Sequence, residues 1–181
     1  MKPNAKDGLA LVYSSEEIQT MVLKIASMID AAYPSDEPLV VVGVLKGAWI
    51  FHADLVRALN RSVVVDFIRA TSYGHATESS GVVRILKDIE VDIRGKHLLL
   101  VEEIIDSGRT LAFIKKRLEH GGALSVKIAA LLDKRVRREV ECSADFLGSE
   151  VPDDFLVGYG LDWAENHRNL EGVYRVVNPK K

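Results

Sequence analysis

The sequence predicts an α/β protein with a mainly parallel central sheet and helices on both faces of that sheet. Apolar runs rich in β-branched residues recur along the chain, stretches of helical periodicity separate them, and small polar turns follow several of the runs. The chain has 181 residues, 48% of them hydrophobic and 28% charged, which is enough for one domain with a full core.

The first half of the chain alternates helices and strands. Ser14 with the acids at 16 and 17 is typical of a helix cap, and apolar residues at helical spacing follow until Tyr33-Pro34 ends the pattern. The expected elements are a helix at 16–32, a strand at 39–44, a helix at 48–59 and a strand at 63–68.

The second half continues this alternation after a polar segment at 70–81. That segment is long for a hairpin loop, and such loops are often functional. The elements expected after it are a strand at 82–86, a strand beginning near Leu98, a helix at 110–120 closed by Gly121-Gly122, and strands at 126–132, 155–159 and 173–177.

The most informative segment is the one from His97 to Leu111. An apolar strand leads into the acid pair Glu102-Glu103, and two residues later the polar turn Asp106–Thr110 opens a helix. Loop amides and a helix N-terminus, with a partial charge of about +0.5, bind phosphate, and the acids can hold sugar hydroxyls or a magnesium-bound ligand. An acidic strand end before a Gly turn is also common in α/β proteins of other function. The segment as a whole favours a site for a phosphorylated sugar.

Three polar turns are expected at one edge of the sheet. The Lys46-Gly47 turn, the loop at Asp106 and Lys134 each follow a predicted core strand. Ligands of such sheets bind at the carboxyl ends of the strands, so these three turns can converge on one ligand.

Charge and cysteine content exclude several classes of protein. The net charge of −2 gives no global attraction to nucleic acid or membranes, and the basic clusters at 115–117 and 134–138 are expected to be solvated faces. The single Cys142 excludes an internal disulfide and a multi-cysteine metal site, and it favours a cytoplasmic location. Residues 1–7 lack the apolar core of a signal peptide, and no apolar run approaches the ~20 residues of a membrane span.

The segment 102–110 resembles the loop that binds 5-phosphoribosyl pyrophosphate (PRPP) in type I phosphoribosyltransferases. The usual form of that loop is two acids, two apolar residues and then Asp-Thr-Gly-Lys-Thr. Here Ser107 replaces the Thr and Arg109 replaces the Lys, which keeps the hydroxyl and the cation. Glu103 departs from the usual Asp, and its extra methylene shifts the carboxylate by about one bond length.

Other segments resemble the hypoxanthine-guanine branch of this family, in order along nearly the whole chain. Residues 44–48 are similar to a Leu-Lys-Gly-Gly turn that binds pyrophosphate and whose Lys-Gly peptide bond can be cis. Ser72-Tyr73 resembles a lid that closes over the substrate. Residues 132–135 and 151–162 resemble the segments that surround the purine.

The resemblance implies a role for each matched residue. Lys134 would donate to the O6 atom of the purine, and because an ammonium has no acceptor it suits a 6-oxo group better than a 6-amino group. Phe155 would stack on the base, and the backbone of Leu156 would read its edge. Asp162 would lie near a second magnesium ion, and Arg168 would contact pyrophosphate.

The activity implied is transfer of 5-phosphoribose from PRPP to N9 of hypoxanthine or guanine, with Mg²⁺ as cofactor. Asp106 would be the acid/base residue near purine N7, with the ribose hydroxyls or magnesium held by the acid pair. The residues expected to hold PRPP and its phosphates are Lys46, Gly47, Glu102, Glu103, Ser107, Gly108, Arg109, Thr110 and Arg168. The resemblance further implies one domain over residues 1–181, whose terminal segments form a small hood over the C-terminal strand edge, and a homodimer or homotetramer without nucleic acid or membrane partners.

Several alternatives stay open at this point. An RNA-binding regulator built on the same fold would use the Arg135–Arg138 cluster. A dinucleotide-binding dehydrogenase is disfavoured, because Gly43–Gly47 lacks the Gly-x-Gly-x-x-Gly spacing. Taken singly, Phe155 is equally typical of a core aromatic, and Lys134 of a surface lysine. The sequence leaves the choice among hypoxanthine, guanine and xanthine open.

Overall fold

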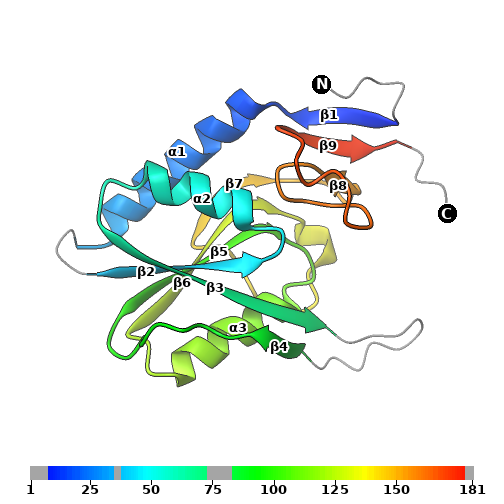
Figure 1. Ribbon diagram of the computed structural model, residues 1–181. Coiled ribbons are helices and arrows are strands. Elements are labelled where there is room, and N and C mark those ends of the chain that lie inside the picture. The colour runs from blue at the N-terminus through cyan, green and yellow to red at the C-terminus, as the bar shows by residue number, and fades with distance from the viewer. Residues whose placement is uncertain (1–7, 35–37, 73–82, 178–181) are drawn as a thin grey trace.

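The computed structural model describes residues 8–34, 38–72 and 83–177 (Figure 1). A six-stranded sheet lies at its centre, with the strand order β4-β3-β2-β5-β6-β7. All neighbouring strands are parallel except β3 and β4, which run antiparallel at one edge. The six strands are β2 (Leu39–Leu45), β3 (Val63–Ser72), β4 (Val83–Lys87), β5 (His97–Ile105), β6 (Ser125–Asp133) and β7 (Phe146–Glu150).

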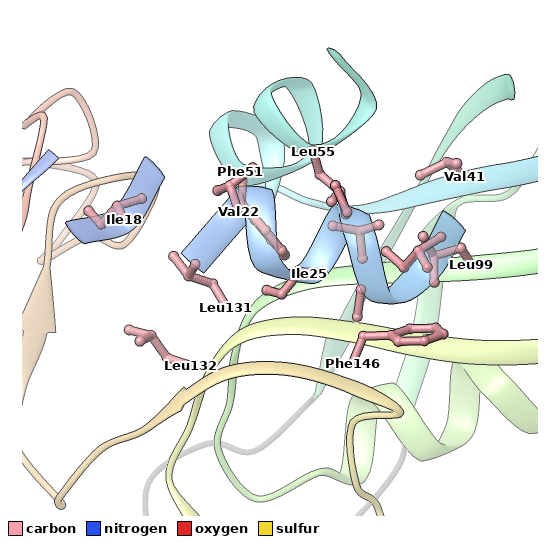
Figure 2. Close-up of a cluster of buried hydrophobic side chains, with 14 of the residues drawn as sticks. Ile18, Val22, Ile25, Val41, Phe51, Leu55, Leu99, Leu131, Leu132 and Phe146 are labelled. Atoms are coloured by element: carbon pink, nitrogen blue, oxygen red, sulfur yellow. The ribbon is translucent and has the colours of Figure 1, made fainter. Parts of the chain in front are cut away.

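Helices cover both faces of this sheet, as the sequence predicts. Helices α1 (Ser15–Ala32) and α2 (Trp49–Ala58) lie on one face, and α3 (Arg109–His120) lies on the other (Figure 1). Successive residues of a strand point to opposite faces, so Val41 joins the core under α1 and α2, whereas Val40 joins the core under α3. Figure 2 shows the first core, in which Ile25 of α1 and Phe51 of α2 are fully buried above the sheet.

The start of α1 is fixed by a capping box. The Ser14 hydroxyl accepts a hydrogen bond from the Glu17 amide, and the Glu17 carboxylate accepts one from the Ser14 amide. This arrangement satisfies two of the amides that a helix N-terminus leaves unpaired. Among the described residues, no helix is both long enough and apolar enough to cross a bilayer.

The two ends of the chain form a second, three-stranded sheet. Strand β9 (Val173–Val176) lies between β1 (Leu9–Tyr13) and β8 (Leu156–Val157), and both pairings are antiparallel. Figure 1 shows this sheet beyond the carboxyl ends of the central strands, where a hood is expected. The segment after β8 packs against the turn that follows β2, because a Cβ atom at Gly160 would lie 2.0 Å from the Gly47 carbonyl oxygen.

Two predicted boundaries are wrong, and a cis peptide bond lies beside the one that the resemblance indicates. Residues 70–72, expected in a loop, continue β3 because they pair with residues 83–85 of β4. The late strand expected at 155–159 is only two residues long, since Gly158 and Tyr159 turn the chain with positive φ angles of 95° and 48°. A cis peptide bond joins Leu45 to Lys46, one bond before the Lys46-Gly47 bond that the resemblance indicates. Neither bond precedes a proline, so the local sequence does not indicate which of the two is cis.

A buried carboxylate fastens the segment after β4 to the sheet. Asp66 of β3 is 7% exposed and accepts hydrogen bonds from the amides of Phe67, Glu90 and Val91, with Lys87 Nζ 3.5 Å away. Burial opposes ionisation, but the three amide donors and the lysine outweigh it and lower the pKa of the Asp66 carboxyl below its ordinary value.

We expect Asp66→Asn to destabilise the fold by about 1–3 kcal/mol near neutral pH, because an amide cannot accept all three hydrogen bonds. A lowered folded-state pKa stabilises the fold above the unfolded-state pKa, and this contribution is lost as the pH falls through the folded-state value. Urea unfolding from about pH 6 to about pH 3 should therefore show a smaller acid loss in the variant than in the wild type. Glu119→Gln is the control, since Glu119 is an exposed residue of α3. Equal behaviour of the two variants would contradict this account.

Candidate functional site

The acid pair lies near the carboxyl end of β5, the strand between β2 and β6. Both side chains are half-buried. Burial raises the pKa of the Glu102 carboxyl well above its ordinary value, and the neighbouring Glu103 carboxylate raises it further. Burial also raises the pKa of Glu103, against the lowering effect of Arg168. Two half-buried carboxylates side by side form a site that favours a cation or hydroxyl donors.

The turn after β2 packs directly onto Glu103. A Cβ atom at Gly47 would lie 1.6 Å from Glu103 Oε1, so any larger residue would force the Glu103 carboxylate to move. On its other side, the Gly47 carbonyl oxygen lies against Gly160, which has a φ of +99°. The turn after β2, the end of β5 and the segment after β8 therefore meet at one point.

The loop after β5 turns through Gly108, which has a φ of +80°, and α3 begins at the next residue. The first amides of a helix have no partner within the helix, so they are available to an anion. A cavity of about 250 Å³ lies between this loop and the turn after β2. Its lining is formed by Val44, Leu45, Lys46, Gly47, Glu102, Glu103, Ile104, Ile105, Asp106, Ser107, Gly108, Thr110 and Leu111.

A larger cavity of about 560 Å³ lies elsewhere, and Ile18 of α1 and Ile50 of α2 are among the residues that line it. None of the predicted site residues lines it. The smaller cavity is the candidate site, because it brings together carboxylates, a lysine and an amide-rich loop.

Lys134 lies directly beside the loop of Asp106. Its backbone amide donates to the Ile105 carbonyl oxygen at 2.9 Å, and the residue is 8% exposed. It is therefore not a surface lysine. Arg137, three residues on, extends Nη1 to within 3.6 Å of Asp106 Oδ2 and Nε to within 2.9 Å of Asp153 Oδ1. This arginine connects the loop after β5 to the segment that precedes Phe155.

Phe155 is not a core aromatic, because it is 47% exposed. Its ring lies edge-on to Trp163, with ring centroids 6.1 Å apart at 64°. An exposed ring held by a second aromatic residue is suited to stacking on a flat base. Leu156 is buried in β8 and pairs with Arg175 of β9, which fixes the backbone next to the ring.

Charged side chains gather at the other end of the site. Arg168 Nη2 lies 2.8 Å from Asp162 Oδ1 and 3.1 Å from Glu165 Oε2, and Lys46 Nζ lies 2.7 Å from Glu165 Oε1. Arg168 Nη1 also donates to the Gly160 carbonyl oxygen at 2.8 Å. Lys46 first, and then Arg168, lower the pKa of the Glu165 carboxyl. The network ties the turn after β2 to the segment after β8.

Among the described residues, seven predicted site residues do not line this cavity: Ser72, Arg109, Lys134, Phe155, Leu156, Asp162 and Arg168. Arg109 Nε donates to Glu139 Oε2 at 2.5 Å, so its guanidinium is engaged outside the cavity lining. Ser72 is the last residue of β3, and Tyr73 lies outside the described residues, so the expected lid has no structural description.

Sequence reasoning missed four residues of the site. Arg137 and Arg138 belong to the basic cluster at 134–138 that is expected to be a solvated face, but both bind acceptors near Asp106. Arg138 Nη1 donates to the Asp106 carbonyl oxygen at 2.6 Å, and its Nη2 pairs with Asp133. Glu165 and Gly160 carry no local signal, since their importance lies in contacts with a turn more than 100 residues earlier.

The carboxylates of the site fit Mg²⁺. Among the described residues, Glu103 Oε2 is a buried oxygen without a hydrogen-bond partner, as is expected of an atom that binds a ligand. No group of three or more metal-ligating side chains occurs in residues 8–34, 38–72 and 83–177. Mg²⁺ is usually held by one or two carboxylates together with substrate phosphates, so the acid pair meets its requirements.

Comparison with known proteins gives the class first. A model of the phosphoribosyl transferase domain matches residues 14–164, which include the acid pair, the Asp106 loop and the aromatic pair. This stretch is most of the chain, so the class of the protein is that of the phosphoribosyltransferases.

Individual relatives narrow the assignment. The chain is 49% identical over 176 residues to a hypoxanthine-guanine phosphoribosyltransferase of Aquifex aeolicus, covering 97% of this chain and 99% of that protein. The enzyme of the same name from Bacillus subtilis is 44% identical, with 88% of each chain covered. A crystal structure of a Bacillus anthracis hypoxanthine-guanine phosphoribosyltransferase has 44% identity and a TM-score of 0.88, covering 93% of this chain and 98% of that one. The chain belongs to the phosphoribosyltransferase family. Within that family it belongs to the hypoxanthine-guanine branch.

We expect Gly160→Ala to destabilise the protein by about 3 kcal/mol or more, because the residue has a positive φ and its new Cβ atom would meet the Gly47 carbonyl. Gly95→Ala is the matched control. Gly95 has a φ of +67° but no atom within 4 Å of a built Cβ, so its cost should be about 1 kcal/mol. Chemical denaturation measures both values. Similar losses in the two variants would show that the contact with Gly47 is not tight.

Proposed function

We propose that this protein transfers 5-phosphoribose from PRPP to N9 of hypoxanthine or guanine and releases pyrophosphate. The observation that carries the proposal is the cavity at the carboxyl ends of β2 and β5, which combines an acid pair, a lysine-glycine turn and an amide-rich loop. The names of the close relatives support the same reaction.

The loop after β5 is proposed to hold the 5-phosphate of the substrate. Ser107, Gly108 and Thr110 line the cavity, and the amides at the start of α3, which have no partner within the helix, lie in the same turn. Arg109 contributes its backbone amide to this turn, since its guanidinium is paired with Glu139. Glu102 and Glu103 would hold the ribose hydroxyls that follow the phosphate.

The opposite end of the cavity is proposed to receive pyrophosphate. Lys46, the backbone of Gly47 and Arg168 provide donors there. Glu102, Glu103 and Asp162 are the residues that would hold Mg²⁺. When bound, Mg²⁺ neutralises negative charge that develops on the leaving pyrophosphate.

The chemistry exchanges one bond at C1 of the ribose for another. The bond from C1 to the pyrophosphate oxygen breaks ahead of full attack, the bond from C1 to purine N9 forms, and pyrophosphate keeps the electron pair. Asp106 is proposed to act as the general acid or base for the purine proton near N7. Arg137, whose Nη1 lies 3.6 Å from Asp106 Oδ2, holds this carboxylate in place.

The purine is proposed to stack on Phe155, with its 6-oxo group at Lys134 and its edge along the Leu156 backbone. A buried ammonium is a donor without an acceptor, so it favours a 6-oxopurine over a 6-aminopurine. The preference among hypoxanthine, guanine and xanthine depends on the groups that face the other edge of the base.

Several features outside the cavity complete the proposal. Residues 1–181 form one domain located in the cytoplasm, with Ser72-Tyr73 as the lid. A homodimer or homotetramer is proposed on the resemblance to the family alone. The RNA-binding alternative receives no support, because Arg135, Arg137 and Arg138 are each paired with carboxylates.

We expect Asp106→Asn to retain the fold but to lose about 10²- to 10⁴-fold in kcat, since the amide cannot take up a proton. Asp153→Asn is the control, because Asp153 also pairs with Arg137 but has no role in the proton transfer. Steady-state kinetics and thermal melting of both variants provide the test. Wild-type turnover in Asp106→Asn would remove this residue from the mechanism.

Pyrophosphate release from PRPP should require Mg²⁺ and proceed with hypoxanthine or guanine but poorly with adenine. Lys134→Gln should lower kcat/KM for the 6-oxopurines about 10- to 100-fold and reduce the discrimination against adenine. Lys116→Gln, on the exposed side of α3, serves as the control. No release with any purine would refute the proposed function, and an unchanged ratio of 6-oxopurine to adenine activity in Lys134→Gln would refute the role of Lys134.

A further inference from the structure

A tight turn positions the Glu165 side chain beside Lys46 and Arg168, at the end of the site proposed to bind pyrophosphate. The amide of each of Trp163 and Asn166 donates to the carbonyl oxygen of the other, at 3.1 and 3.0 Å, so Ala164 and Glu165 form the centre of the turn. Their φ angles are 48° and 67°. Turns of this type ordinarily contain Asn-Gly, because other L residues rarely adopt positive φ at both positions. The chain thus holds Glu165 in an unfavourable backbone conformation.

The Glu165 carboxylate bridges two cations that come from distant parts of the chain. Oε1 lies 2.7 Å from Lys46 Nζ, and Oε2 lies 3.1 Å from Arg168 Nη2. Asp162 supports the turn, since its Oδ2 accepts from the Glu165 amide at 2.8 Å while its Oδ1 contacts Arg168. The arrangement is specific, because each carboxylate oxygen of Glu165 has a cation of its own.

This bridge is exposed enough to exchange with a ligand. The side chains of Glu165 and Lys46 are 63% and 46% accessible, and ion pairs in contact with water are weak. A pyrophosphate group carries several charges and several acceptor oxygens, so it competes successfully for the same donors. Lys46 and Arg168 are therefore able to exchange the internal carboxylate for an external anion.

We propose that Glu165 is a positioning residue that occupies Lys46 and Arg168 when pyrophosphate is absent and exchanges with it during the reaction. The proposal rests on the function proposed above. An internal anion that must be displaced weakens the binding of PRPP and of pyrophosphate by the same factor. The same contact re-forms as pyrophosphate leaves, which favours release of the product.

The test compares Glu165→Gln with Glu171→Gln, an exposed glutamate on the same C-terminal segment. In Glu165→Gln, the KM for PRPP and the inhibition constant of pyrophosphate should fall together by about threefold to tenfold, without an increase in kcat. Glu171→Gln should leave all three values unchanged. A purely structural role of Glu165 would lower kcat or stability without tightening the binding of either anion.

Direct titration separates this proposal from the proposed reaction. Calorimetry with pyrophosphate at fixed Mg²⁺ should show tighter binding to Glu165→Gln than to the wild type, and it requires no turnover. Should that variant fold poorly, Glu165→Asn has the same expectation, because Asn tolerates positive φ. Unchanged or weaker binding of pyrophosphate overturns the exchange. Absence of turnover in the wild type overturns the reaction and leaves the titration as a test of Glu165.

Discussion

The close packing of Gly47 between Glu103 and Gly160 is the contact on which the rest of the site depends. A single added carbon at Gly47 would lie 1.6 Å from Glu103 Oε1, and one at Gly160 would lie 2.0 Å from the Gly47 carbonyl. Because both residues are glycines, the turn after β2, the end of β5 and the segment after β8 can meet at this point. Because the parallel register of β2 and β5 ends both strands at one edge, this contact places the lysine of one turn beside the acids of the next strand.

Charge pairing across segments then keeps the site ordered. Arg137 connects Asp106 to Asp153, and Arg138 connects the Asp106 loop to Asp133. Both arginines join groups from different turns, so these turns are held together before a substrate arrives. Such preorganisation is effective in stabilising a developing charge, because the donors need not reorient during the reaction.

The fold class can be predicted from the sequence, because the order of strands and helices is visible in local hydrophobic patterns. Runs of β-branched residues alternate with amphipathic helices, and the structure has the parallel sheet and the two helical layers that this alternation predicts. Strands β1 and β7 have no such pattern. β7 is five residues long and contains Gly148, whose missing side chain leaves room for the Leu131 carbonyl oxygen, so its strand conformation depends on pairing with β6.

The candidate site likewise contains some features that the local sequence predicts and others that depend on contacts between distant segments. The acid pair lies near the carboxyl end of a strand, and the Asp106 loop and the Lys46-Gly47 turn each follow a strand directly, so their meeting at one edge could be predicted from the sequence. The contacts of Arg137 and Glu165 could not be predicted in this way, because they join turns that are neighbours only in three dimensions. The arginine cluster illustrates the difference: its local sequence is that of a solvated face, but its members neutralise carboxylates around Asp106.

The most direct test of this account is a crystal structure of the protein with guanosine monophosphate, pyrophosphate and Mg²⁺. The phosphate of the nucleotide should lie on the amides of residues 107–110, its base on Phe155 with the 6-oxo oxygen at Lys134, and pyrophosphate at Lys46 and Arg168. Nucleotide bound in the cavity between α1 and α2, or a base and phosphate that do not share the edge of β2 and β5, would contradict it.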